Sequence, residues 1–126
     1  MNIKLEIIDF FSGDIDEVWN WIPEFDEEVF FHLEIVVAEV GKKGGNLFQM
    51  EIATVEGLKN FRLKYPDKNI SSHGLIIIEN YSWESLLNHL KSEIEVCSLN
   101  SWQESMQCLS KKFLWEYEDY KWDFEN

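Results

Sequence analysis

The sequence contains little positive charge. Eleven lysine and arginine residues stand against 24 aspartate and glutamate residues, which gives a formal net charge of −13 at pH 7. A surface of this sign repels phosphate, so it argues strongly against DNA, RNA or an anionic membrane as the main binding partner. A cationic partner is favoured instead.

Long apolar runs are also missing, and cysteine is scarce. Apolar runs such as residues 75–78 are far too short to span a bilayer, and Glu6 and Asp9 interrupt the apolar N-terminal stretch as no signal peptide would allow. Two cysteines, Cys97 and Cys108, are too few for a disulfide framework. They are interpreted as buried thiols, and we expect a cytoplasmic protein in reducing surroundings.

Familiar catalytic and ligand-binding motifs are absent. The sequence has no Walker loop, GxGxxG, GxSxG or HExxH motif. The three histidines, His32, His73 and His89, have no partner at the spacing of zinc ligands and are interpreted as structural or surface residues. We expect no cofactor, no metal and no enzymatic activity, although a pocket with a strongly perturbed acid or histidine near His32 or His73 would favour an enzyme.

The length and hydrophobic pattern predict one folded domain over residues 1–126. The chain is 45% hydrophobic and 15% aromatic, which is enough for a real core. Alternating apolar residues predict strands at residues 3–7, 29–40 and 47–53, and a glycine-rich turn joins the last two into an antiparallel hairpin. The uniformly apolar residues 75–78 predict a strand buried on both faces.

Helices are predicted mainly in the second half of the chain. Thr54, Ser82 and Ser101 are suitable N-caps for a short helix over residues 55–64 and for apolar stripes at residues 83–94 and 102–113. The order predicts an α+β fold, with a mostly antiparallel sheet of about four strands and two or three helices packed on one face.

The acidic residues are concentrated early in the chain. No lysine or arginine lies between Lys4 and Lys42, and residues 9–39 hold ten carboxylates together with several aromatic side chains. Aromatics exposed among carboxylates are typical of a protein interface, whereas buried ones would belong to the core, and the sequence leaves both possibilities open. The acidic C-terminal tail is a second candidate for the segment that contacts a partner. The predicted partner contacts are Asp14, Asp16, Glu17, Trp19, Glu24, Asp26 and Glu27, followed by Glu116, Glu118 and Asp119 of the tail.

Several motifs, in their order and spacing, resemble immunity protein 8 of bacterial polymorphic toxin systems, which include contact-dependent growth-inhibition loci. The similarity covers roughly residues 15–121, and the chain departs from the family pattern at Val40, Asn46 and Val55. The matching stretches are Trp21-Ile-Pro23, Phe30-Phe31, the hairpin turn at residues 40–48, Ala53-Thr54 into Leu58, residues 74–83, and Trp102 onward to residues 113–120.

The resemblance implies an immunity protein that binds the toxin domain encoded beside it and blocks that toxin in the producing cell. Many such toxins are nucleases, whose clefts must be positive to hold phosphate, so an acidic inhibitor would suit them. The rival hypothesis is an acidic mimic of nucleic acid that regulates a host protein. That mimic would need carboxylates spaced like phosphates along an elongated surface. The oligomeric state is left open.

Overall fold

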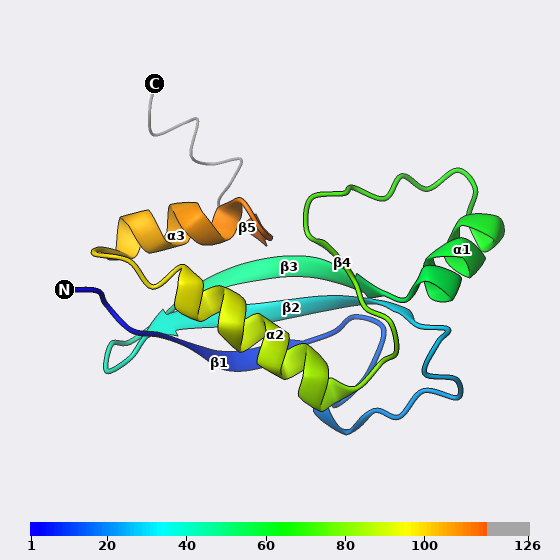
Figure 1. The fold of residues 1–126 in the computed structure, drawn as a ribbon, viewed down its shortest axis with the longest axis horizontal. Helices are drawn as coiled ribbons and strands as arrows, with labels where there is room; N and C mark the ends of the chain where they lie inside the picture. The colour runs from blue at the N-terminus through cyan, green and yellow to red at the C-terminus, as the bar shows by residue number, and fades with distance from the viewer. Residues whose placement is uncertain (116–126) are drawn as a thin grey trace.

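The computed structural model describes residues 1–115 as a sheet with helices packed against it (Figure 1). The α+β prediction is confirmed, and the sheet has five strands where about four were expected. In chain order the elements are β1 (Leu5–Phe11), the 3₁₀ turn η1 (Val18–Asn20), β2 (Phe30–Glu39), β3 (Asn46–Ala53), α1 (Val55–Lys64), β4 (Leu75–Ile77), α2 (Trp83–Val96), α3 (Trp102–Ser110) and β5 (Leu114–Trp115).

The predicted hairpin is the centre of the sheet. β2 pairs antiparallel with β3 through eight consecutive residue pairs, and β1 pairs antiparallel with the other edge of β2. The outer edge of β3 is shared by two short strands. β4 runs parallel to it opposite Glu51, and β5 runs antiparallel to it opposite Gln49. A two-residue strand such as β5 has no periodicity to detect, which explains why the sequence did not predict it.

The prediction that residues 75–78 form a strand buried on both faces is wrong. Within residues 1–115, β4 pairs with β3 alone and lies at an edge of the sheet, where Ile77 keeps 48% of its surface exposed. The uniformly apolar sequence of β4 resembles that of a central strand. Whether a strand is central or at an edge depends on the order of the strands in the sheet, which the sequence of one strand does not contain.

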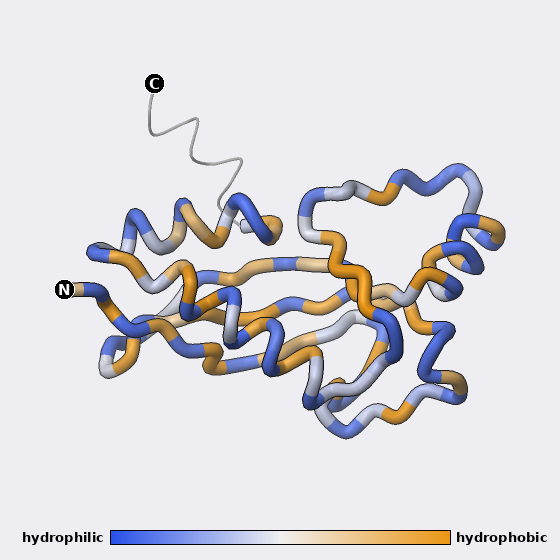
Figure 2. The backbone as a smooth tube through the Cα atoms, viewed as in Figure 1, coloured by the Kyte–Doolittle hydropathy of each residue, from blue (hydrophilic) through white to orange (hydrophobic). Residues whose placement is uncertain are grey.

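The core lies between the sheet and two of the helices. Alternate residues of β2 and β3, from Phe31 to Val37 and from Phe48 to Ile52, are almost fully buried and contact the apolar stripes of α2 and α3. Figure 1 shows α2 crossing the sheet, and Figure 2 shows apolar and polar residues alternating along the strands. Two helices therefore share one face, as predicted. None of the helices within residues 1–115 has the length and apolar content needed to cross a membrane.

The third helix, α1, sits at one end of the sheet and is held by Thr54. As predicted, Thr54 is the N-cap, and its hydroxyl accepts a hydrogen bond from the Gly57 N–H at 3.0 Å. A β-carbon on Gly57 would lie 1.9 Å from the carbonyl oxygen of Val29, so only glycine lets α1 approach this closely. Phe61 of α1 then stacks on Phe30 with the ring centroids 4.0 Å apart.

The interpretation of the cysteines as free thiols is also wrong, because Cys97 and Cys108 form a disulfide. Cys97 follows the last residue of α2, and the short connection to α3 brings Cys108 opposite it with the two Cα atoms 5.4 Å apart. That separation suits a disulfide. The contact depends on how the two helices fold back on each other, which spacing along the chain does not reveal.

This disulfide leads to a stability prediction. It closes a loop over a sequence separation of 11, for which the chain-entropy model gives about 3 kcal/mol of stabilisation. We expect the Cys97→Ser/Cys108→Ser variant to unfold at a lower urea concentration than the oxidised wild type and to be insensitive to dithiothreitol. Two free thiols titrated in the native wild type without reductant would contradict the assignment.

An aromatic cluster beneath the chain that joins β1 to β2 contains a buried hydroxyl. Tyr81 is 6% exposed and makes edge-to-face contacts with Trp21 and Phe31. No group among the described residues hydrogen-bonds its hydroxyl, and burial raises the pKa of Tyr81 to about 12. An unpaired buried hydroxyl costs free energy, so the apolar contacts of this ring outweigh that cost.

We expect the Tyr81→Phe variant to be more stable than wild type by about 1 kcal/mol at pH 7, because it loses the unpaired hydroxyl. In wild type, the unfolded tyrosine ionises near pH 10 and the folded one near pH 12, so stability is complete below pH 10 and falls as the pH rises toward 12. Urea unfolding between pH 7 and 12 measures both effects. Tyr65→Phe is the matched control, and equal alkaline losses in both variants would contradict the prediction.

Candidate functional site

The segment between β1 and β2, residues 12–29, carries most of the predicted contact residues, and we call it the acidic loop. All seven of its carboxylates are exposed. Among the residues that the structure describes, none of the seven forms an ion pair. The seven are Asp14, Asp16, Glu17, Glu24, Asp26, Glu27 and Glu28. A dense set of like charges without ion-pair partners is available to an external cation.

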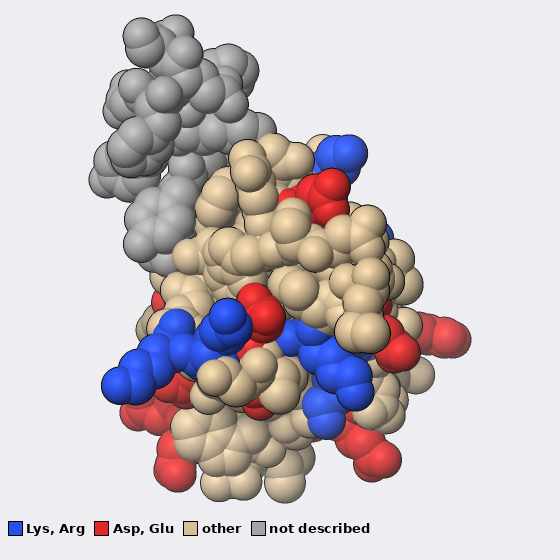
Figure 3. Space-filling model, turned by 90° about the vertical axis from the view of Figure 1, so that its left-hand side faces the viewer, with Lys and Arg blue, Asp and Glu red and all other residues tan. Residues whose placement is uncertain are grey.

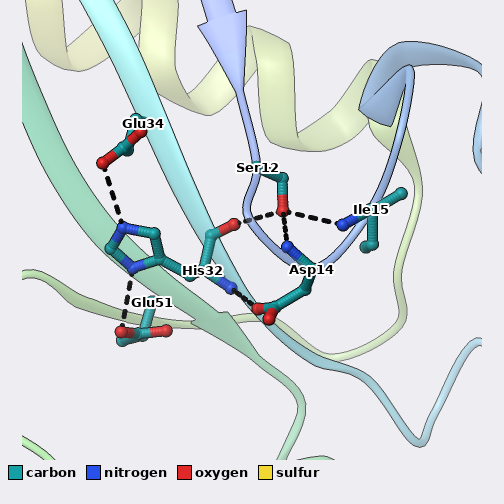
Figure 4. Close-up of polar contacts among 6 residues, drawn as sticks. All are labelled: Ser12, Asp14, Ile15, His32, Glu34 and Glu51. Carbon is teal, nitrogen blue, oxygen red and sulfur yellow. Dashed lines mark hydrogen bonds and ion pairs between the residues drawn. The ribbon is translucent and has the colours of Figure 1, made fainter.

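The first end of the acidic loop is tied to the middle of the sheet at His32. The Ser12 hydroxyl donates to the His32 carbonyl oxygen at 2.6 Å, and the Asp14 carboxylate accepts from the His32 backbone N–H at 2.8 Å (Figure 4). Asp14 is therefore a structural residue as well as a candidate contact. The same Ser12 oxygen accepts the backbone N–H groups of Asp14 and Ile15, which fixes the turn that leaves β1.

The second end of the loop is held through its backbone. The Thr54 hydroxyl donates to the Glu27 carbonyl oxygen at 2.6 Å, and the backbone N–H of Tyr81 donates to the Asp26 carbonyl oxygen at 2.8 Å. Val18 and Val29 are each only 1% exposed and anchor the loop in the core. Because the main chain and two valines make these attachments, the carboxylates of Asp26 and Glu27 remain in solvent.

Apolar side chains are exposed among these carboxylates. Trp19 is 45% exposed, Phe25 51% and Ile22 86%, whereas Trp21 turns inward against Phe31. The sequence left open whether the aromatic residues of this segment are exposed or buried in the core, and both cases occur within the loop. Ile22 and Phe25 were not among the predicted contacts, although Phe25 is one of the aromatic residues that the sequence places among the carboxylates of residues 9–39. The combination of an apolar centre and a charged rim is typical of protein interfaces.

The predicted contacts lie as follows. The seven on the acidic loop, from Asp14 to Glu27, are all exposed. The second-choice residues of the tail, Glu116, Glu118 and Asp119, lie outside the described residues. Exposure is necessary for contact with a partner but does not demonstrate it, so both sets remain predictions.

Glu17 has an unusual backbone conformation. Its φ is +45°, and within residues 1–115 it is the only residue other than glycine with a positive φ. It precedes the 3₁₀ turn η1, whose first residue is the buried Val18. The left-handed region costs a residue with a β-carbon about 1 kcal/mol or more, so an asparagine or glycine would be more relaxed here.

A second cluster, which the sequence did not reveal, surrounds the His32 side chain. Its Nδ1 lies 3.0 Å from Glu51, the residue opposite it on β3, and its Nε2 lies 3.5 Å from Glu34, two residues further along β2 (Figure 4). The three side chains are 28–32% exposed. His32 was interpreted as structural, and the missing information was the register that places Glu51 beside it.

A cavity of about 410 Å³ adjoins this cluster and includes both His32 and His73 in its lining. Tyr81, whose pKa burial raises, is not part of that lining. His73 Nε2 lies 3.0 Å from the Phe113 carbonyl oxygen, so it can donate a hydrogen bond to the backbone. No group of three or more histidine, cysteine or acidic side chains in the described part of the chain is arranged to hold a metal ion.

Basic side chains lie at both ends of the described surface. The hairpin turn between β2 and β3 carries Lys42 and Lys43, and the Val40 N–H donates to the Lys4 carbonyl oxygen at 2.9 Å, which places Lys4 beside them. Figure 3 shows basic and acidic side chains interspersed on this end of the molecule. The acidic loop lies at the other end in Figure 1. Helix α1, at that same end, carries Lys59, Arg62 and Lys64, so positive charge is present at both ends.

Comparison with known proteins identifies the family. The model of one family, immunity protein 8, matches residues 5–120 of the 126. Neither the curated proteins nor the solved structures contain a match to this chain. The matched region includes every strand and helix described above, together with the acidic loop and the His32 cluster. The chain therefore belongs to the immunity protein 8 family.

Proposed function

We propose that this protein binds a cognate toxin domain through the acidic loop and thereby neutralises the toxin. Its family is one of immunity proteins, which supports a toxin-neutralising role. The observation that carries the proposed surface is the acidic loop itself, where seven exposed carboxylates without described ion partners surround Trp19, Ile22 and Phe25. No reaction by the protein is required for this role.

The toxin that fits this surface is a basic domain, and nucleases are the class we favour. A nuclease cleft must be positive to hold phosphate, so an acidic inhibitor can occupy or cover it. Complementary charge also raises association rates, to about 10⁸–10⁹ M⁻¹s⁻¹ at low salt. Such a protein would act in the cytoplasm of the producing cell, where a nuclease meets nucleic acid.

The direct test uses the C-terminal domain of the large protein encoded next to this gene. We expect the two polypeptides to copurify as a stable complex and co-expression to rescue cells from the toxin. The association rate should fall as salt concentration rises. A neighbour-encoded domain that neither binds this protein nor is neutralised by it would overturn the proposal.

The loop charges can be tested without disturbing its anchors. We expect Asp16→Asn/Glu24→Gln/Asp26→Asn to lower the association rate with the toxin domain about tenfold at low salt and to flatten its salt dependence, because steering depends on net local charge. Stopped-flow fluorescence at several salt concentrations measures both.

The control removes three charges elsewhere. Glu84, Glu95 and Glu104 are exposed on α2 and α3, and their replacement by glutamine changes net charge equally. If the two triple variants slow association equally, only net charge matters and the acidic loop is not the contact surface.

Glu17 allows stability and binding to be separated. We expect Glu17→Asn to raise the unfolding free energy by up to about 1 kcal/mol, because asparagine tolerates the left-handed conformation better. The same change should weaken toxin binding a few-fold, because it removes a contact carboxylate. Chemical unfolding and calorimetric titration give the two values. A more stable variant with unchanged toxin affinity would remove Glu17 from the interface.

A further inference from the structure

The face of the sheet that points away from α2 and α3 is a second surface with the properties of an interface, and we call it the open face. Strand register identifies its members, since Phe11 pairs with Glu34, Glu34 with Gln49, and His32 with Glu51. These residues alternate with the core residues of the same strands. The open face includes Glu6, Asp9, Phe11, His32, Glu34, Val36, Gln49 and Glu51.

The open face combines negative charge with exposed apolar groups. Phe11 is 46% exposed, and Ile8, at the irregularity in the β1 register, is 51% exposed. Strands β1, β2 and β3 include no lysine or arginine between them. A second copy of this chain is a poor occupant, because two molecules of charge −13 repel each other. A cationic protein surface fits both the charge and the apolar groups.

The His32 cluster holds more negative charge than His32 can satisfy. The imidazole can carry at most one positive charge, whereas its two nitrogens face one carboxylate each at 3.5 and 3.0 Å. A planar cation with several N–H donors, such as an arginine guanidinium, would balance the remaining negative charge.

The cavity beside the cluster can accept such a side chain. Asp14 and Glu51 line it with carboxylates, and the stacked pair of Phe30 and Phe61 lines it with aromatic rings, on which a guanidinium can pack. Lys68 also lines the cavity, but its ammonium lies 4.9 Å from the centroid of the Tyr65 ring, where it makes its own cation–π contact. The cavity has a volume of about 410 Å³, which leaves room for one long side chain.

The open face and the acidic loop form one continuous surface. Ser12 and Asp14, at the start of the loop, bind the backbone of His32 on both its N–H and its carbonyl side. A partner that contacts the loop therefore reaches the His32 cluster across Asp14. Because the two surfaces are continuous, the cationic protein that would contact the open face is the toxin domain proposed to bind the acidic loop.

We propose that an arginine side chain of the cognate toxin enters the cavity at His32, bonds with Glu51 beside Glu34 and packs against Phe30. This inference rests on the proposed function, and it assigns the two parts of the surface different tasks. The acidic loop accelerates encounter, whereas the pocket holds the bound toxin. A long-range charge mainly changes the association rate, and a partly buried charge pair mainly changes the dissociation rate.

The test compares Glu34→Gln/Glu51→Gln with wild type for binding of the neighbour-encoded toxin domain. We expect the dissociation rate to rise about tenfold or more, with a much smaller change in the association rate. The matched control, Glu84→Gln/Glu95→Gln on α2, removes the same charge from the other side of the sheet and should leave the dissociation rate unchanged. Thermal unfolding of each variant confirms that it is folded.

A double-mutant cycle identifies the toxin residue. Each arginine of the toxin is changed to alanine and measured against wild type and Glu51→Gln, and we expect one arginine to lose its effect in the Glu51→Gln background. If no toxin arginine couples to Glu51, the proposal is overturned.

The remaining outcomes separate the two proposals. If wild type does not bind the toxin domain, the proposed function fails. If wild type binds and the open-face variant dissociates no faster than the control, the pocket assignment fails and the proposed function stands. A change in the sedimentation coefficient of the free open-face variant, with unchanged toxin dissociation, would indicate that a second copy covers this face, and would also overturn the pocket assignment.

Discussion

The register of β2 on β3 determines how both sides of this protein are used. With Leu33 opposite Met50 and Ile35 opposite Phe48, every second residue of the hairpin enters the core beneath α2 and α3. The same register sets His32 opposite Glu51 on the other face. A slip of one residue would expose the core residues and bury the acidic ones, so the hydrophobic core holds the charged cluster in place.

The acidic loop shows how a folded chain can keep a dense set of like charges exposed. Its attachments are made by Ser12, by Thr54 and by backbone groups, and two buried valines anchor it without using any cation. Asp14 is the exception, because its carboxylate accepts a backbone N–H. The repulsion among the remaining carboxylates lowers stability, and a cationic partner would relieve it. This arrangement suits a protein whose task is to bind a basic partner.

Local chemistry explains which predictions succeeded. The hairpin, the caps at Thr54, Ser82 and Ser101 and the extent of α1 were predictable because each depends on residues within a few positions of one another. Helix propensity alone marks Gly57 only as a weak point in α1. The actual function of Gly57 is to allow close approach to Val29, which lies 28 positions earlier and could not be inferred from helix propensity.

The sequence alone determined the acidic character of the protein, the α+β order of its elements and the membership of the candidate contact segment. These follow from composition and from short-range periodicity. Only the tertiary structure decided that Cys97 and Cys108 bond, that β4 lies at an edge, that Ile22 and Phe25 are exposed, and that His32 lies between two carboxylates. Each of these depends on which distant segments become neighbours. That choice is made by packing of the whole core, because no short stretch of chain contains the residues on both sides of the contact.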